Sequence, residues 1–306
     1  MSEQHATYHV PVLLKEAVDG LDIKPNGVYV DITFGGGGHS REILSRLDKN
    51  GRLIAFDQDA DAQKNAEAVS DKRLTLVQGN FRFLRNYLRR LNAPEVDGIL
   101  GDLGVSWHQF DTAERGFSFR FEAALDMRMN GKVEQTAGTL INTYSAAELS
   151  KIFSAYGELD NAPRAAKLIA AAREQKPIKS VSELVETLKP VLPKFDEHKY
   201  LAKVFQALRI EVNREMQALE QMLNQTATAI RQGGRLSVIT YHSLEDRMVK
   251  NFIRSGNVSG EVQKDFYGRV SAPFAAVNKK VILPAEEEVQ RNTRARSAKL
   301  RIAQRQ

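Results

Sequence analysis

Four short apolar runs alternate with amphipathic stretches in the first third of the chain. The apolar runs occupy residues 28–32, 52–57, 74–78 and 98–102, and the amphipathic stretches occupy residues 40–47, 60–69 and 81–91. Strands of this buried type that alternate with helices predict a parallel, doubly wound sheet with helices on both faces. We therefore expect an α/β domain.

The alternation stops after the fourth run. Residues from about 111 to 210 show helical patterns and loops, without a strand of comparable strength. Helices are expected to begin at Ser145 and at Ser180, whose spacing to Glu183 suits a capping box. This pattern predicts a helical insertion that leaves the sheet after its fourth strand, at the carboxyl edge where such sheets bind ligands. Two domains joined by a linker are the weaker alternative.

The β/α pattern returns where a long helix ends near residue 231. Gly233 and Gly234 then precede a strand at residues 235–241, and a further helix follows Ser243. Two final strands are expected at residues 277–283 and 299–302. We interpret the chain as one α/β domain interrupted by the helical insertion.

The first strand ends in Asp31 and leads into a run of four glycines, residues 35–38. Glycines let the backbone approach a ligand closely, and Asp57, at the end of the second strand, is placed to bind ribose hydroxyls. Ser40 takes the third glycine position of a G-x-G-x-x-G pattern and His39 precedes it. This departure disfavours nicotinamide oxidoreductases and favours enzymes that use S-adenosylmethionine (SAM). A tight turn without a ligand is the alternative, but four glycines carry a large entropic cost for that purpose.

Two further strand ends carry candidate residues. Phe81 follows the third strand after Gly79 and Asn80, and its ring is placed to pack on an adenine, although ordinary core packing is nearly as good an explanation. Asp102 ends the fourth strand, near the expected position of the reacting group of a bound nucleoside, and its alternative role is to cap a loop or helix.

The segment after Asp102 has the character of a substrate loop. Trp107, the only tryptophan, is followed by His108, Gln109 and Asp111, and then by two motifs at residues 115–119 and 125–129. Aromatic side chains such as Phe117 and Phe119 can stack on a splayed base while arginines hold phosphates. Both phenylalanines fit the core of the insertion equally well.

Tyr241 and His242 leave the strand at residues 235–241 at the same carboxyl edge and are candidates for contact with a base. Ser243 is expected to cap the following helix, whose first turn carries Glu245 and Asp246.

Composition excludes several chemistries. The 306 residues contain no cysteine, so disulfides, thiolate metal sites and cysteine nucleophiles are impossible, including the thiolate route to methylation at carbon 5 of a pyrimidine. The six histidines are scattered, and only His5 and His9 have an i,i+4 spacing, so we expect no metal site. No apolar run approaches a membrane span and the N-terminus does not have the form of a signal peptide, so we expect a cytoplasmic protein without a membrane partner.

A net charge of +6 modestly favours a polyanionic partner. One cluster lies on the predicted helix at residues 81–91 and consists of Arg82, Arg85, Arg89 and Arg90. A second cluster lies in the last stretch, without an acid among its members, and consists of Arg291, Arg294, Arg296, Lys299, Arg301 and Arg305. We expect this tail to contact nucleic acid.

Motifs from one end of the chain to the other resemble the RsmH (MraW) family of SAM-dependent ribosomal RNA small-subunit methyltransferases. The matching segments are residues 9–14, 33–40, 102–106, 115–119, 125–129, 205–213, 242–247 and 292–301. The resemblance implies a class I, Rossmann-like SAM methyltransferase fold with an inserted all-helical domain. It also implies that the enzyme methylates N4 of a cytidine in the decoding region of 16S rRNA.

The resemblance further implies site residues and domains. The family's SAM-binding positions fall on Gly37, Gly38, His39, Asp57, Phe81, Asp102 and Gln109. Residues 1–110 and 211–306 would form the SAM-binding domain, and residues 111–210 the substrate-recognition domain. Trp107-His108 stands where members often have serine and proline, and Tyr241 replaces a common phenylalanine. The partner would be 16S rRNA or the small ribosomal subunit. The sequence is compatible with an oligomer.

For catalysis we favour Asp102 as the acceptor for a hydrogen of the cytosine amino group, with Tyr241 and His242 as weaker candidates. Three other classes remain open. A nicotinamide oxidoreductase would not require the basic tail, and a non-catalytic ribosome-assembly factor would not require intact acids at the strand ends. A DNA amino-methyltransferase would be expected to carry an Asp/Asn/Ser-Pro-Pro-aromatic motif, where this chain has Asp102-Leu-Gly-Val.

Overall fold

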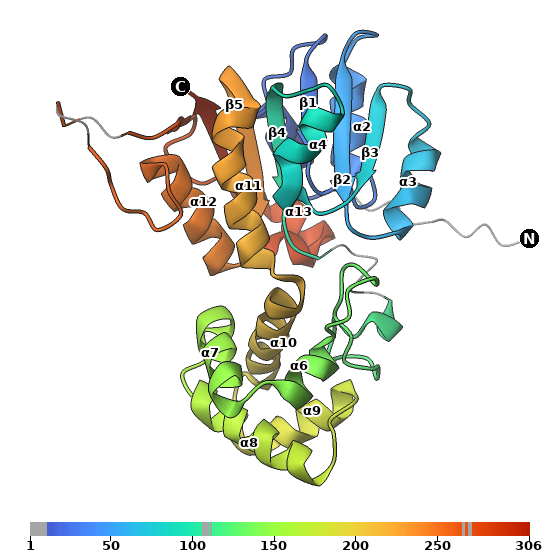
Figure 1. Ribbon diagram of the computed structural model, residues 1–306, viewed down its shortest axis with the longest axis vertical. Helices are drawn as coiled ribbons and strands as arrows, with labels where there is room; N and C mark the ends of the chain where they lie inside the picture. The colour runs from blue at the N-terminus through green and yellow to red at the C-terminus, as the bar shows by residue number, and fades with distance from the viewer. Residues whose placement is uncertain (1–10, 106–109, 111, 265–266, 269–270) are drawn as a thin grey trace, which may run out of the picture. The chain divides into compact units, whose positions relative to one another are not determined.

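The computed structural model describes residues 11–105, 110, 112–264, 267–268 and 271–306 (Figure 1). The chain divides into two compact units, one formed by residues 1–104 with 216–306 and the other by residues 105–215. Among the described helices, none is both long enough and apolar enough to cross a membrane.

The first unit is built on a seven-stranded sheet in the order β3-β2-β1-β4-β5-β7-β6. The strands are β1 (Val28–Asp31), β2 (Arg52–Asp57), β3 (Leu74–Gln78), β4 (Val96–Asp102), β5 (Ile230–Thr240), β6 (Phe274–Ala276) and β7 (Lys299–Arg305). Strands β1 to β5 pair in parallel, and β7 and β6 complete the sheet in antiparallel fashion. The order reverses between β1 and β4, which is the position where open α/β sheets bind their ligands.

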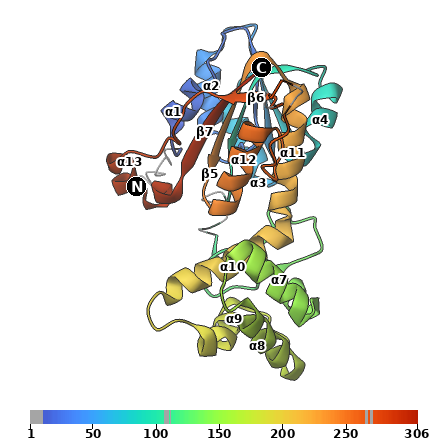
Figure 2. The same ribbon diagram turned by 90° about the vertical axis from the view of Figure 1, so that its left-hand side faces the viewer.

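Side chains alternate between the two faces of the sheet, and each face has its own core. Val30, Ile54 and Ile99 lie in a core with residues of helices α4 (Leu84–Arg90), α11 (Glu215–Ala229) and α12 (Ser243–Ser255). Tyr29, Leu53 and Leu100 lie in a second core with residues of α1 (Leu14–Asp19) and α2 (Gly38–Arg46). Figures 1 and 2 show these two helical layers on opposite faces of the sheet. The remaining elements of this unit are α3 (Asp61–Val69), η1 (Phe81–Phe83), α13 (Glu286–Arg291) and η4 (Thr293–Ser297).

Among its described residues the second unit contains helices and loops but no strand, apart from one isolated bridge between Ala124 and Ser180. Its elements are η2 (Ala113–Arg115), α6 (Ala137–Thr143), α7 (Ala146–Gly157), α8 (Ala162–Gln175), α9 (Val181–Leu188), η3 (Lys189–Val191) and α10 (Glu197–Asn213). Ser145 and Ser180 cap α7 and α9, which confirms both predicted helix starts and the capping box predicted at Ser180. Ser145 forms a capping box as well, with Glu148.

Two local predictions are wrong, at residues 277–283 and at the start of β5, and the helix predicted at residues 81–91 is present but differs in the type of its first turn. Residues 277–283 do not form a strand: Ile282 makes a single bridge to Leu300, and β6 lies earlier in the chain. The helix predicted at residues 81–91 begins as the 3₁₀ turn η1. Strand β5 begins before Gly233 and Gly234, and the glycines accommodate an irregularity in its pairing with β4, where a side chain at Gly234 would approach the Asp97 carbonyl oxygen to 2.6 Å.

Candidate active site

The glycine turn between β1 and α2 combines an open position with packed ones. Gly35 and Gly37 have φ angles of 51° and 75°, in the region that favours glycine. An added Cβ at Gly36 would meet no atom within 4 Å, whereas one at Gly38 would lie 2.0 Å from Pro11 Cγ. Gly36 therefore leaves room for a ligand, and Gly38 is required by the packing of α2 on Pro11.

Three side chains hold this turn in place. The Gly35 amide donates to Asp57 Oδ2 at 2.8 Å, and Asn65 Nδ2 donates to the Gly35 carbonyl oxygen at 3.0 Å. Arg41 donates to the Gly36 carbonyl oxygen at 2.8 Å. The turn is thus pre-organised by side chains of β2, α3 and α2.

Asp57 ends β2 and is half-buried. Besides Gly35, its carboxyl accepts a hydrogen bond from the Asp59 amide at 2.8 Å. Burial raises its pKa to about 6, against the opposing effect of these backbone donors. Each carboxylate oxygen has a second lone pair, so the group can accept further hydrogen bonds from ligand hydroxyls.

Asp31, the acid at the end of β1, has a structural role. Its side chain is fully buried and accepts hydrogen bonds from Ser40 Oγ at 2.7 Å and from the Thr33 amide at 3.0 Å. It joins β1 to the start of α2 and is closed to solvent.

Phe81 begins η1, directly after the end of β3. Asn80 caps this turn by accepting a hydrogen bond from the Arg82 amide at 2.9 Å, and its side-chain amide donates to Gln58 Oε1 at 2.8 Å. Phe81 is half-buried against the core beneath it. Core packing therefore accounts for part of the ring, and the remaining part is accessible.

Asp102 is held from three sides at the end of β4. Its amide donates to Thr33 Oγ1 at 2.7 Å, its Oδ1 accepts a hydrogen bond from the Tyr241 hydroxyl at 2.7 Å, and its Oδ2 lies 3.8 Å from His39 Nδ1. About a quarter of the side chain remains exposed, at 23%. Burial raises its pKa to about 6, and His39 and the Tyr241 hydrogen bond oppose this rise.

His39 is a buried residue in the first turn of α2. Its Nε2 lies 3.1 Å from the carbonyl oxygen of Val12. A carbonyl oxygen can only accept, so Nε2 carries the hydrogen and Nδ1 is the atom that faces Asp102.

His242 is the N-cap of α12. The prediction that Ser243 caps this helix is therefore wrong, because Ser243 is the first residue of the helix itself. The His242 ring accepts a hydrogen bond from the Glu245 amide at 3.4 Å, and its Nε2 lies 3.1 Å from Glu245 Oε1. Buried Glu245 also accepts a hydrogen bond from the Tyr241 amide at 2.9 Å. Glu245 therefore fixes the backbone at Tyr241, while the His242 side chain caps the first turn of α12.

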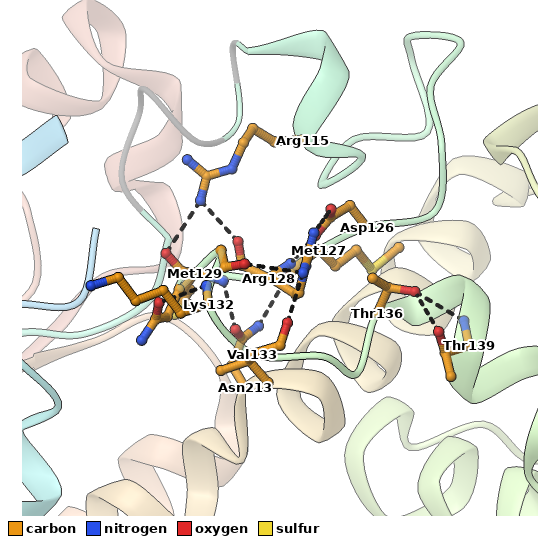
Figure 3. A network of polar contacts seen from close by, with 12 residues as sticks. Arg115, Asp126, Met127, Arg128, Met129, Lys132, Val133, Thr136, Thr139 and Asn213 are labelled. Carbon is orange, nitrogen blue, oxygen red and sulfur yellow. Dashed lines mark hydrogen bonds and ion pairs between the residues drawn. The ribbon is translucent and has the colours of Figure 1, made fainter. Parts of the chain in front are cut away.

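In the second unit, the two matched motifs form a polar network (Figure 3). Arg128 makes a bidentate ion pair with Asp126 and donates to the Val133 carbonyl oxygen at 2.7 Å. Arg115 donates to the carbonyl oxygens of Arg128 and Met129 at 2.8 and 3.3 Å. The expectation that these arginines hold phosphates is therefore corrected, because their guanidinium groups bind the protein itself.

The aromatic residues of this segment also have internal partners. Phe117 belongs to the core of the second unit and is 5% exposed, so of the two readings the structure favours core packing. Phe119 is half-buried and stacks on His198 with ring centroids 5.7 Å apart. Trp107, His108 and Gln109 lie outside the described residues.

The structure thus brings His39, Asp102 and Tyr241 together, and places Asp57 against the neighbouring glycine turn. Sequence reasoning did not identify Thr33 or Glu245 as residues that position the site. The spacing of Glu245 to His242, which suits a capping box, was the available signal for the latter.

A sheet reversed at β1 and β4, an open glycine turn and acids at the ends of β2 and β4 form the nucleotide-binding edge of an α/β enzyme, the class that includes the SAM-dependent methyltransferases. Residues 6–306 match the MraW methylase family, and the chain belongs to that family. It is 57% identical over 304 residues to ribosomal RNA small subunit methyltransferase H of Bacteroides thetaiotaomicron, covering 99% of each chain. The protein of the same name from Parabacteroides distasonis is 56% identical over 305 residues, again with 99% of each chain covered. The one from Cytophaga hutchinsonii is 54% identical over 299 residues, covering 98% of this chain and all of the relative.

Proposed function

We propose that this enzyme transfers a methyl group from SAM to the exocyclic N4 of a cytidine in the decoding region of 16S rRNA, in the cytoplasm. The observation that carries the proposal is the placement of Asp102 at the end of β4, where Tyr241 holds one carboxylate oxygen and the side chain stays partly exposed. The names of the relatives, all methyltransferases of small-subunit ribosomal RNA, support the choice of polymer.

The residues present fit SAM as the methyl donor. Gly36 offers open space where a side chain would otherwise stand, and the half-buried Asp57 retains acceptor capacity for ribose hydroxyls. Phe81 presents a partly accessible ring at the next strand end, suited to an adenine face. Gly37, Gly38 and His39 form the start of α2 beside this turn, and we assign Gln109 to the same set by its motif. When bound, SAM supplies a methyl group on a sulfonium that is a good leaving group.

The difficult partner in this reaction is the nucleophile, since the N4 lone pair of cytosine is delocalised into the ring. A carboxylate that accepts a hydrogen bond from the amino group raises the electron density on N4 and stabilises the positive charge that develops there. We assign this role to Asp102. Tyr241 holds Oδ1, which leaves Oδ2 as the oxygen for the amino group.

Transfer of the methyl group leaves one proton too many on N4. The raised pKa of Asp102, about 6, suits a group that is ionised near neutral pH and yet basic enough to take up this proton. Tyr241 remains the hydrogen-bond donor throughout, because burial and the neighbouring Asp102 raise its pKa well above the usual value. We assign substrate recognition to the helical unit. The proposed function is compatible with a monomer and with an oligomer.

The test is transfer of radiolabelled methyl groups from SAM, offered side by side to small ribosomal subunits, naked 16S rRNA and duplex DNA. Nuclease digestion then locates the label. We expect label at N4 of a single rRNA cytidine. Asp102 is also one of the SAM-binding positions, so Asp102→Asn is assayed at saturating SAM, where we expect a loss of at least 100-fold in rate. Full turnover by Asp102→Asn would refute the role of the carboxylate, and label on DNA would refute the choice of polymer. SAM binding without methyl transfer to any substrate would favour a binding factor.

A further inference from the structure

The arginines of η1 and α4 form a basic surface that the reaction described above does not use. This arginine face consists of Arg82, Arg85, Arg89 and Arg90. No acidic residue occurs in the sequence between Asp71 and Glu95, so the segment carries positive charge alone. Leu84 and Leu88 are buried in the core and fix which side of α4 faces the sheet.

The guanidinium groups of the arginine face have no hydrogen-bond or ion-pair partner among the described residues. Within the part of the chain that the structure describes, no carboxylate or carbonyl oxygen accepts a hydrogen bond from any of these four guanidinium groups. Arg82 packs its guanidinium over the ring of Phe83, 4.5 Å from the centroid, and its buried Nε has no hydrogen-bond partner. Phe83 itself is 42% exposed.

The basic tail, which the sequence predicts to contact nucleic acid, differs in this respect. Arg301 makes a two-point ion pair with Asp246, at 2.7 and 3.1 Å, and Lys299 lies 3.6 Å from the same carboxylate. Arg305 donates to the carbonyl oxygens of Ala227 and Pro273. Much of the tail charge therefore stabilises the fold, whereas the charge on α4 is available to a partner.

The backbone of the arginine face is fixed in advance. The Arg85 amide donates to Gln225 Oε1 at 2.9 Å, and Gln225 Nε2 donates to the Arg82 carbonyl oxygen at 2.7 Å. Arg85 and Arg89 are four residues apart on α4, which corresponds to about 6 Å along the helix axis. The face begins next to Phe81 in η1, which follows the carboxyl end of β3, and continues along α4. Figure 1 shows the position of α4 beside the sheet.

We propose that the arginine face binds the phosphate backbone of the RNA substrate, with Phe83 as a stacking surface for a base. Guanidinium groups match phosphate oxygens in a two-point geometry, and a line of them that lacks carboxylate partners is suited to a polyanion. An exposed aromatic ring beside arginines provides stacking that tolerates any base. The inference rests on the proposed RNA substrate, and it identifies a surface of the first unit that binds this RNA.

The experiment compares three full-length variants. Arg85→Gln/Arg89→Gln/Arg90→Gln removes the charge with a residue of similar helix propensity, and Arg85→Lys/Arg89→Lys/Arg90→Lys keeps the charge. The control, Lys49→Ala/Lys250→Ala/Lys264→Ala, removes three exposed lysines from outside η1 and α4 and changes the net charge equally. Binding to a 16S rRNA transcript is measured as a function of salt, together with SAM affinity and binding to vesicles of anionic lipid.

For the Gln variant we expect RNA binding weakened roughly tenfold and a slope of log K against log salt smaller by about 2, because each lost phosphate contact removes roughly 0.7 to 0.9. The Lys variant should keep the wild-type slope because it keeps the charge, the control should stay near wild type, and SAM affinity should not change. An unchanged slope for the Gln variant, an equal loss in the control, or a loss confined to lipid vesicles would overturn the inference. If the wild type binds RNA but methylates none, the proposed function fails while the slopes still decide the role of this surface.

Discussion

The Tyr241 hydroxyl donates a 2.7 Å hydrogen bond to Asp102 Oδ1, and the two residues are 139 positions apart in the sequence. Asp102 ends β4 and Tyr241 directly follows β5, its parallel neighbour, so the pairing of these strands brings the two side chains to one edge. The bond has an electrostatic consequence, because it opposes the rise in the Asp102 pKa that burial causes.

Tyr241→Phe should therefore raise the pKa of Asp102 further. We expect the acid limb of the pH–rate profile to move to higher pH and the rate at neutral pH to fall about tenfold, since the variant loses a hydrogen bond to a charged group. SAM affinity should be retained. The measurement is kcat against pH at saturating SAM.

Tyr29→Phe is the matched control for this prediction, because the Tyr29 hydroxyl accepts a hydrogen bond from the Lys24 amide at the opposite end of the sheet. It should lower stability without moving the pH profile. An unshifted pH–rate profile for Tyr241→Phe would show that Tyr241 does not influence the pKa of Asp102.

Asp102→Asn should increase stability above neutral pH while it abolishes activity. The pKa of Asp102 in the folded protein, about 6, lies above the ordinary 3.8. Between these values the folded protein holds a proton that the unfolded chain has lost, so the free energy of unfolding falls as the pH rises from about 4 to 6. Asn cannot ionise and can still accept from Tyr241. Urea unfolding at pH 8 should show a gain of about 1 to 2 kcal/mol that disappears near pH 4. A loss of stability at pH 8 would contradict the argument.

Alanine at Gly36 and at Gly38 should have opposite signatures. Gly36→Ala meets no atom within 4 Å, so the protein should fold with unchanged stability but bind SAM at least tenfold more weakly, because the methyl group occupies the ligand space. Gly38→Ala collides with Pro11 and should cost about 1 to 3 kcal/mol of stability. Thermal unfolding and calorimetric titration with SAM distinguish the two. Normal SAM affinity in Gly36→Ala would show that the glycine turn is not part of the SAM-binding site.

Arg128→Lys should loosen the network of the helical unit. Lysine cannot reproduce the bidentate pair with Asp126 together with the bond to the Val133 carbonyl oxygen, so we expect a loss of about 2 kcal/mol. Limited proteolysis should then cut within residues 126–133. Lys132→Ala, in the same loop and exposed, is the control and should behave as wild type. Equal protection in Arg128→Lys would show that other contacts order the loop.

The strands of the sheet could be predicted from the sequence because the local pattern of apolar and polar residues determines where each strand lies. Strands β2 and β3 have the predicted bounds: β2 is a buried run between Arg52 and Asp57, and β3 is a half-buried run that ends at Gln78. The two serine capping boxes of the helical unit were predictable for the same reason. The strand predicted at residues 277–283 does not form, although its apolar positions resemble a strand. Ile282 forms one bridge to Leu300 and the Val277 amide donates to the Ile302 carbonyl oxygen, and these two contacts do not make a ladder.

The site was predictable in part only. The glycine turn, Asp57 and Asp102 follow from motif and strand ends, but the contact of Asp102 with Tyr241 depends on the register of β4 and β5. The pairing of Arg301 with Asp246 is equally non-local, so counting charges could not show that part of the tail charge has an internal partner. In the same way, the internal bonds of Arg115 and Arg128 cannot be read from composition.

The insertion of residues 105–215 between two neighbouring strands constrains the order in which the molecule can assemble during synthesis. Strands β1 to β4 emerge first with the glycine turn, Asp57 and Asp102, but β5 and Tyr241 follow only after the whole helical unit. Closing so long a loop costs entropy that grows slowly with its length, and a helical unit rich in local contacts shortens it by folding early. Until β5 arrives, β4 is an unprotected sheet edge and Asp102 has no hydroxyl partner. A nascent chain therefore passes through a stage with most of the cofactor residues present and the catalytic carboxylate unsupported, so activity should begin only after the last strands have been made.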